Sequence, residues 1–372
     1  MAFQFQSIAA VAPMVQKQFD VSIASVGVLI GLYFLPGIAL AFFGGKIGQK
    51  FGDKPTTLAA LALMLVGGLI MAVSSEWNAQ IAGRLVAGAG GVLLNVQLTK
   101  MVTDWFAGRE IATAMAVFVN SWPVGIAISL SMLPLIGTFY GIAAVHLAVV
   151  VFIALGLLIL ASSYKAPPSQ QAAPRETSVN PDARVIVAVI AAGFIWGVYN
   201  IGFAMIFSFG PTLLVENGWS ITAAGSAVSL VLWTCVFSIP LGGLLADKTK
   251  MPVAIMSTGW IGTAILLIGL SHGAPVIATL VAIGLFCGVP AGAIMSLPGR
   301  VLRPETRSVG MGLFYTAYYA SMMIGPSIGG WFVKYAGRAD PALDFGAAMF
   351  LLCLPILWFF YRWCTLRNLA NA

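Results

Sequence analysis

Long apolar stretches separated by short polar segments make up most of this chain. Each stretch reaches the length of about 20 residues that an α-helix needs to cross the hydrocarbon core of a bilayer. Eleven of them predict membrane-spanning helices at 24–46, 55–74, 79–100, 111–133, 142–163, 185–209, 221–245, 252–271, 275–298, 308–333 and 342–362. The pattern predicts an all-α membrane protein that crosses the bilayer many times.

The first residues form a shorter apolar stretch. Residues 1–16 are apolar, and a polar segment from Lys17 to Asp20 follows them. They lack the basic leader and cleavage site of a signal peptide. We therefore predict the second half of a further helix, whose beginning is missing because translation starts upstream of Met1 or because the chain was shortened. With this helix counted as helix 1, the expected total is twelve, and the eleven ranges above are helices 2 to 12.

A polar segment divides the predicted helices into two groups of six. Residues 165–184 contain four prolines and five charged residues, a composition typical of a flexible linker. We predict a six-helix bundle at 1–163, a cytoplasmic linker at 164–184 and a second bundle at 185–372. The two halves repeat each other, since Gly44-Gly45 and Gly242-Gly243 end equivalent helices at an offset of 198 residues.

The basic residues predict the orientation. If both termini are cytoplasmic, fifteen Lys and Arg residues lie on the cytoplasmic side and three on the outer side. Cytoplasmic loops of membrane proteins carry such an excess. We expect a multi-pass protein of a bacterial-type inner membrane with both termini in the cytoplasm.

Composition narrows the possible functions. Hydrophobic residues make up 60% of the chain and charged residues 8%, whereas soluble proteins carry about 25% charged residues. The net charge of +7 is spread over short loops, so a nucleic-acid partner is not expected. With two histidines, no cysteine pair of the CxxC type and no P-loop, we predict no metal, no cofactor, no enzyme and no ATP-driven pump. A transport-inactive sensor would be expected to carry an appended domain.

Two repeated loop motifs suggest a family. The first is Gly45-x3-Gln49-Lys50 and the second is Gly243-x3-Asp247-Lys248. They are similar to the loops after helices 2 and 8 of the major facilitator superfamily, although Gln49 replaces the usual acid. The resemblance covers the whole chain and implies twelve helices in two pseudo-symmetric bundles and transport by alternating access. It also implies gating charge networks that include Gly45, Lys50, Arg109, Gly243, Asp247, Lys248 and Arg307; the alternative is that these are ordinary positive-inside loops.

An arginine lies within the fourth predicted helix. The segment Arg84-x3-Gly88-x-Gly90 resembles a motif of the same family. Arg84, Gly88, Gly91 and Asn95 fall on one helix face, where the glycines allow close helix contact. An arginine inside a span is costly, which favours a functional role. Alternatively, Arg84 lies near the outer end and extends to the lipid headgroups.

By resemblance, a central cavity lined by helices 1, 4, 7 and 10, with contributions from 2, 5, 8 and 11, binds the solute. Aromatic residues and an amide recur at helical spacing in helix 7, which indicates either packing or substrate contact. The predicted substrate-binding residues are polar or aromatic and lie on these helices: Gln4, Tyr33, Arg84, Asn95, Asn120, Trp196, Tyr199, Asn200, Tyr315 and Tyr319.

No Asp or Glu lies in the middle of a predicted span. A carrier with a positive residue and no such acid suits a small organic or inorganic anion, or a neutral solute. The nearest resemblance is to small-anion porters of the cyanate and monocarboxylate type. The alternative is a multidrug-type exporter of neutral or drug-like compounds, although helix 5 lacks the Gly-Pro pair of family antiporters. The transport mode stays open between uniport, anion exchange and symport with a proton that the substrate or His146 holds. We expect the protein to act as a monomer.

Overall fold

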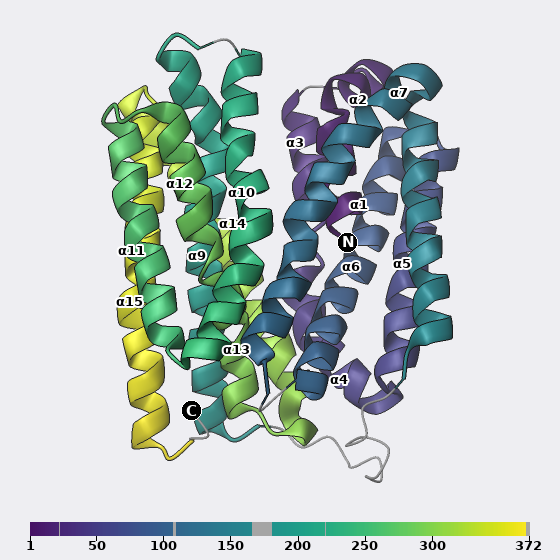
Figure 1. Ribbon diagram of the computed structural model, residues 1–372. Helices are drawn as coiled ribbons and strands as arrows, with labels where there is room; N and C mark the ends of the chain where they lie inside the picture. Colours follow the sequence, from purple (N-terminus) through teal and green to yellow (C-terminus); the bar gives the residue numbers. More distant parts are fainter. Residues whose placement is uncertain (22, 107–108, 166–180, 220, 370–372) are drawn as a thin grey trace. The chain divides into compact units, whose positions relative to one another are not determined.

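The computed structural model describes residues 1–372 except 22, 107–108, 166–180, 220 and 370–372. Within the described residues the chain is helical and contains no strand (Figure 1). The helices are α1 (Ala2–Ala10), α2 (Ala12–Phe19), α3 (Ile23–Gly31), α4 (Gly37–Phe51), α5 (Asp53–Val73), α6 (Trp77–Phe106), α7 (Ile111–Ser163), α9 (Ala183–Glu216), α10 (Ile221–Thr249), α11 (Pro252–Ser271), α12 (Val276–Gly288), α13 (Ala291–Val301), α14 (Arg307–Ala336) and α15 (Asp340–Leu366), with a short 3-10 helix, η1 (Pro304–Thr306).

The predicted all-α membrane architecture is confirmed. Each predicted span coincides with one helix, with part of one, or with two shorter helices in sequence. In the described part of the chain, nine helical segments are long and apolar enough to cross a membrane. The helix predicted at 252–271 has these bounds in the structure, as α11.

Three predicted spans are interrupted, which the apolar pattern did not indicate. α1 and α2 are separated at Val11, α3 and α4 at residues 32–36, and α12 and α13 at residues 289–290. A proline stands in the first turn of α2, and Pro36 and Pro290 cap the starts of α4 and α13. Because proline has no backbone N–H, it fits the first turn of a helix and ends the hydrogen bonding of the preceding one.

In α7 the structure joins two predicted spans. The sequence predicted helices at 111–133 and 142–163 with a loop between them, but the chain stays helical up to Gly141. There φ is +81°, a left-handed conformation that glycine adopts without steric cost. The expected loop is therefore reduced to one glycine hinge between two helical segments.

The chain forms two compact units. Unit 1 contains residues 1–105, 121–180 and 304–316, and unit 2 contains residues 106–120, 181–303 and 317–372. Each unit thus includes a short segment from the other half of the sequence. The predicted division at 164–184 follows chain order and stays a prediction, because most of that linker lies outside the described residues.

Unit 1 is built on close contact between α5 and α6. A Cβ added at Gly67 would lie 2.5 Å from both the backbone N of Ala87 and the carbonyl oxygen of Gly83. The two backbones therefore touch, as small residues permit in membrane helices. Buried aliphatic side chains of α1, α3, α5, α6 and α7 surround this contact, among them Ile8, Leu29 and Met64.

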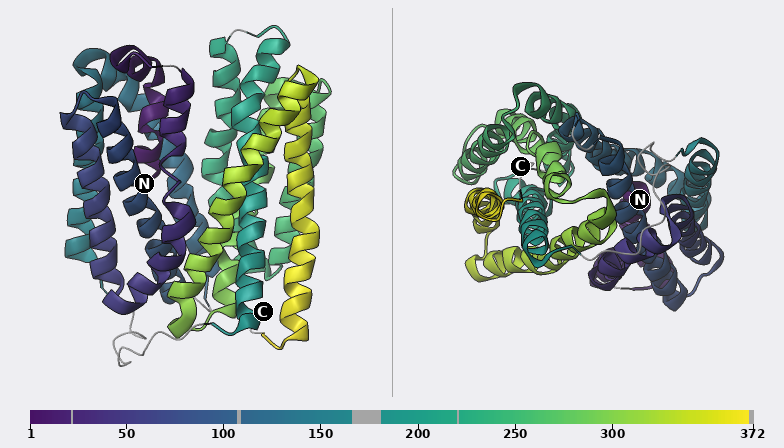
Figure 2. Two further views of the ribbon diagram at one scale, coloured as in Figure 1. Left: turned by 180° about the vertical axis from the view of Figure 1, so that it is seen from behind. Right: turned by 90° about the horizontal axis from the view of Figure 1, so that it is seen from below.

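Unit 2 is built around α9. This helix packs along α15, shown in yellow beside it in Figure 2, and also contacts α10 and α13. The α9–α15 contact is close at Gly202, where an added Cβ would lie 2.9 Å from the carbonyl oxygen of Gly346. α10 packs on α12, and α11 contacts both α12 and α15.

The contact at Gly67 leads to a stability prediction. We expect Gly67→Val to destabilise the protein by about 1–3 kcal/mol, because an overpacked core must shift to accept new atoms. Gly156→Val in α7 is the matched control, since nothing lies within 4 Å of a Cβ added there. Size-exclusion chromatography after heating measures the loss of folded protein. Equal melting temperatures for the two variants would contradict the contact.

Candidate functional site

Arg84 lies two turns into α6 and is fully buried in unit 1. Its guanidinium donates hydrogen bonds to backbone carbonyls of two other helices. Nη1 donates to the oxygen of Gln4 at 2.9 Å, and Nη2 to that of Phe5 at 2.6 Å, both in α1. Nε donates to the oxygen of Leu29 at 3.1 Å, and Nη2 also to that of Ile30 at 3.4 Å, both in α3. One side chain thus links three helices.

The interruption of the second predicted span makes two of these acceptors available. α3 ends at Gly31, so Leu29 and Ile30 lie in its last turn. The backbone N–H of Tyr33 bonds to Ile30 rather than to Leu29, its partner in a continued helix. The last carbonyls of a helix need partners from outside the helix. Arg84 supplies these partners: its N–H groups donate to the carbonyls that the helix break leaves available.

Two aromatic rings cover the guanidinium. Its Cζ atom lies 4.6 Å from the ring centroid of Tyr33 and 5.8 Å from that of Phe5, within the range of cation–π attraction. The Tyr33 hydroxyl donates to Oε1 of Gln4 at 3.2 Å, and Nε2 of Gln4 donates to the carbonyl of Met64 at 2.9 Å. The structure therefore brings together three of the predicted substrate residues, Gln4, Tyr33 and Arg84.

The glycine face of α6 makes room for Tyr33. A Cβ added at Gly88 would lie 2.2 Å from the carbonyl oxygen of Tyr33, and one at Gly91 would lie 2.4 Å from its hydroxyl oxygen. These glycines permit a close approach, as predicted, but the segment that approaches is the break between α3 and α4 rather than a helix. The alternative in which Arg84 extends to the headgroups is wrong, because the side chain turns inward and is completely covered.

The partners of the Arg84 guanidinium are carbonyl dipoles and aromatic rings. Among the residues that the structure describes, no carboxylate oxygen lies within ion-pair distance of its guanidinium. Carbonyl oxygens and π faces carry partial negative charge but no net charge. A full positive charge therefore persists inside unit 1, and a charge held in a span usually marks a functional site.

Two further predicted residues lie nearer the C-terminal end of α6. Asn95 follows Gly91 by one turn, is 6% exposed, and makes no side-chain hydrogen bond within the described part of the chain. One turn later, the Thr99 hydroxyl lies 2.7 Å from the hydroxyl of Tyr315 in α14. Unit 1 thus holds Gln4, Tyr33, Arg84, Asn95 and Tyr315 along one side of α6.

The aromatic stripe of α9 is a continuous ladder in unit 2. Ring centroids are 5.3 Å apart for Trp196 and Tyr199, 6.2 Å for Tyr199 and Phe203, and 4.7 Å for Phe203 and Phe207. The Tyr199 hydroxyl donates to the carbonyl of Cys287 in α12 at 2.7 Å. These contacts are packing contacts, and substrate contact by the ladder stays a prediction.

The other predicted residues of unit 2 have different surroundings. The Asn200 amide donates to the carbonyl of Trp196 one turn earlier at 2.8 Å, so its own helix provides the partner. The Asn120 amide donates to the carbonyl of Val236 at 3.0 Å, but its Oδ1 is buried without a partner in the part of the chain described. Tyr319 lies with its ring centroid 4.9 Å from that of Tyr318.

A buried ion-pair network lies at the C-terminal end of α6. Nζ of Lys100 is 2.7 Å from carboxylate oxygens of both Asp53 and Asp104, and Nη1 of Arg307 is 2.9 Å from Asp104. All four side chains are at most 10% exposed. Of these residues only Arg307 was among the predicted gating residues. The pair Lys100 and Asp104, four residues apart on a helix, is the signal that could have indicated the rest.

The second repeat motif has a defined geometry in unit 2. The carboxylate of Asp247, near the end of α10, accepts hydrogen bonds from the backbone N–H of Thr113 at 2.7 Å and of Ala112 at 3.4 Å. These groups begin α7, where the helix dipole favours a negative charge. A Cβ added at Gly243 would lie 2.5 Å from Cβ of Ala116. Gly243 therefore lets α10 approach, and Asp247, one turn later, caps α7.

Three of the remaining predicted gating residues lie at or beside helix ends. Lys50, Arg109 and Lys248 are exposed, and Nζ of Lys50 lies 5.4 Å from the ring centroid of Phe51. Gly45 belongs to α4, but its surroundings and the side chain of Gln49 lie outside the described part.

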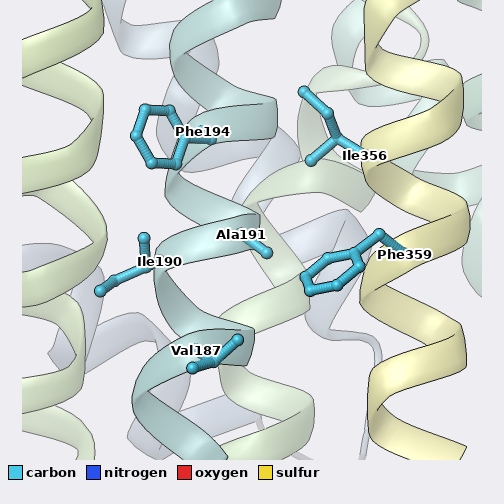
Figure 3. A pocket seen from close by; sticks show the side chains of 6 residues that line it. All are labelled: Val187, Ile190, Ala191, Phe194, Ile356 and Phe359. Atoms are coloured by element: carbon cyan, nitrogen blue, oxygen red, sulfur yellow. The ribbon is translucent and has the colours of Figure 1, made fainter.

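An apolar groove of about 330 Å³ lies between α9 and α15 in unit 2 (Figure 3). The residues that line it are Val187, Ile190, Ala191, Phe194, Ile356 and Phe359. None of them is a predicted substrate residue. The groove offers no polar side chain to orient a charged solute, so we do not assign it to transport.

Comparison with known proteins decides the family. The sequence profile of the Major Facilitator Superfamily matches residues 1–210 and 187–371. The chain belongs to this superfamily. It is a membrane transporter rather than an enzyme, as are its relatives.

Among the relatives of this superfamily member is the hexuronate transporter of Bacillus subtilis (strain 168), which is 22% identical over 92% of this chain and 88% of its own length. The solved structures of the fucose:proton symporter FucP, from E. coli, and the proton:xylose symporter XylE have the same fold. FucP in the outward conformation gives a TM-score of 0.79 at 14% identity over 96% of both chains. XylE gives 0.79 at 13% identity over 96% of this chain and 92% of its own.

The ion-pair network leads to a stability prediction for Lys100, its central cation. We expect Lys100→Met to destabilise the protein by about 3–5 kcal/mol, because it removes the buried cation that Asp53 and Asp104 share and leaves Asp104 with Arg307. Lys100→Arg should retain most of the stability, and the exposed Lys50→Met is the matched control. Thermal melting of the purified variants checks this order. A Lys100→Met variant as stable as Lys50→Met would show that the network carries no stabilising interaction.

Proposed function

We propose that this protein is a secondary transporter of a small organic anion, of the sugar-acid class, across the inner membrane. The observation that carries the proposal is the buried Arg84, for which the described residues supply no carboxylate partner. An anion that binds beside Arg84 supplies the missing counter-charge at the place where the membrane interior makes it most favourable. A neutral solute gains nothing from this charge and a cation is repelled by it.

The polar groups around Arg84 suit a hydroxylated anion. A carboxylate pairs well with a guanidinium, and sugar hydroxyls both donate and accept hydrogen bonds. The amide of Gln4 and the hydroxyl of Tyr33 lie beside Arg84, and the amide of Asn95 lies about three turns farther along α6. The relative that transports hexuronates, which combine one carboxylate with several hydroxyls, supports the same class.

In the state described here the site is closed. Arg84 is fully buried, with Tyr33 bonded to Gln4 across its face. Tyr33 belongs to the residues between α3 and α4, where backbone bonds such as Tyr33 N–H to Ile30 close turns instead of continuing the α-helix. Substrate reaches Arg84 when this segment moves, and the aromatic cover returns when the substrate leaves.

The gating residues fit transport by alternating access. Asp247 comes from the second half of the sequence and caps a helix of the first half; Arg307 likewise pairs with Asp104. These bonds join the two sequence halves at the loops that we assign to the cytoplasm from their Lys and Arg residues. They form in one state of the cycle and separate in the other. The protein acts as a monomer in the bilayer.

Export of drug-like compounds is the second candidate. The four-ring ladder from Trp196 to Phe207 favours it, since aromatic surfaces attract hydrophobic and cationic compounds. The uncompensated charge of Arg84 weighs against a cationic substrate, so we rank this function below anion transport.

A thermal-shift panel tests the proposal. The purified protein is melted with D-glucuronate, D-glucose, nitrate, cyanate and a lipophilic cation. A ligand that binds only the folded state stabilises it by about 2.7 kcal/mol at 100 times its Kd. We expect stabilisation by D-glucuronate and none by D-glucose, which lacks the carboxylate.

The variants for this panel separate the site from general charge effects. Arg84→Gln should remove the response to D-glucuronate, whereas the exposed Arg362→Gln should keep it. Arg84→Lys keeps the charge but loses the planar fork, so we expect a weaker response. Stabilisation by the lipophilic cation alone would favour the exporter instead.

A further inference from the structure

His146 carries a buried imidazole that has no role in the proposed anion site. It lies in the second segment of α7, five residues after the Gly141 hinge, and is 2% exposed. Its Nε2 atom is buried and has no hydrogen-bond partner among the described residues. Buried polar atoms are nearly always hydrogen-bonded, so an exception in a carrier indicates a group that acts in another state of the cycle.

Contacts of α7 with α1 place His146 near the Arg84 cluster. The ring of Phe3 stacks on that of Phe152 with centroids 4.8 Å apart. A Cβ added at Gly68 would lie 2.8 Å from Cγ2 of Val150 and 3.5 Å from Nε2 of Gln4. α1 and the second segment of α7 therefore run antiparallel, with Gln4 at the level of Val150.

The same packing continues on the other side of His146. A Cβ added at Gly137 would lie 3.3 Å from side-chain atoms of both Val11 and Val145. His146 is one turn from Val150, so its level on α7 corresponds to the stretch of α1 between Gln4 and Val11. The carbonyl of Gln4 is also an acceptor for Arg84.

Few other charged groups face this position. α1 contributes the uncharged Gln4 and Ser7, and its α-amino group at Met1 is about two turns from Ser7. α5 carries Asp53 and Lys54 at its start, about 20 Å along the helix from Gly68. α2 carries the exposed Lys17. Arg84 of α6 is the charged side chain that bonds to α1 at Gln4 and Phe5, at the start of the stretch that lies beside His146.

The positions of the Asp and Glu residues direct attention to His146 as a proton-binding group within the described spans. In the described helices, every Asp and Glu lies within about one turn of a helix end. Histidine is the side chain that gains and loses a proton near neutral pH. The second histidine, His272, is exposed at the end of α11.

We propose that His146 is the proton-binding residue that couples anion transport to proton movement. Without substrate, the charge of Arg84 disfavours a second positive charge nearby, and His146 stays neutral. When an anion binds beside Arg84, it offsets that charge, and Nε2 of His146 takes up one proton from water. When the anion leaves on the other side, the charge of Arg84 expels the proton. This inference rests on the proposed function.

The coupling has a defined charge balance. One monovalent sugar acid and one proton cross together, and the imidazole and the guanidinium return to their starting states. The cycle moves no net charge, and an inward proton gradient accumulates the anion. This differs from anion exchange, in which no proton is taken up.

Proteoliposomes test the coupling. D-glucuronate is added outside, and a trapped pH dye and a labelled substrate report proton and anion entry together. We expect wild type and His272→Gln to take up a proton with each anion. His146→Gln should still exchange internal for external D-glucuronate but lose the accompanying proton uptake. Normal proton uptake by His146→Gln would overturn the proposal, whereas no D-glucuronate entry in wild type would refute the proposed function instead.

A second measurement does not depend on a His146 variant that folds. The chain has two histidines, so His272→Gln protein labelled with ¹⁵N-histidine reports on His146 alone. At near-neutral pH we expect its ring nitrogens to change from neutral imidazole to imidazolium signals when D-glucuronate saturates the protein. Signals that stay neutral, while thermal shift shows that D-glucuronate binds, would overturn the proposal.

Discussion

The hydrogen bonds of Arg84 to backbone carbonyls are the interaction on which the first unit depends. A charged side chain inside a span must find partners, because the hydrocarbon offers none. In this protein the partners are carbonyls of α1 and of the last turn of α3, with Tyr33 and Phe5 over the guanidinium. The arginine stabilises the helix break, and the break stabilises the arginine. The arrangement satisfies donors and acceptors but leaves one net charge, which is the basis of the proposed anion site.

The charged residues near helix ends follow the opposite rule. Lys100 and Arg307 have carboxylate partners in Asp53 and Asp104, and Asp247 binds the start of a helix. The charges of Asp53, Lys100, Asp104 and Arg307 sum to zero, whereas the charge of Arg84 has no such partner among the described residues. Compensated pairs suit a gate, because the attraction between opposite charges holds one state closed and is released in the other. An uncompensated charge suits a binding site, because the substrate completes it. The two patterns of charge thus separate the candidate gate from the candidate site.

Much of this structure follows from the sequence, but the long-range contacts do not. Apolar length was enough to locate the helices, and the repeat Gly243-x3-Asp247 indicated a loop with a defined contact. Helix breaks were missed because proline is ambiguous: Pro211 and Pro240 lie inside continuous helices. The partners of Arg84 could not be predicted, since they are backbone carbonyls that every residue carries. The pairing of Asp53 with Lys100 joins residues 47 positions apart, and no spacing rule connects them.

The central question is whether the carrier selects its solute by negative charge. Counterflow in proteoliposomes tests this most directly, because it needs neither an ion gradient nor a known coupling ion. Vesicles loaded with unlabelled D-glucuronate are diluted into labelled D-glucuronate or into labelled D-glucose, two sugars that differ at C6 by the carboxylate. We expect rapid entry of labelled D-glucuronate, and no entry of labelled D-glucose beyond that into protein-free vesicles. Equal entry of both sugars, or entry of D-glucose alone, would contradict a site built around the charge of Arg84.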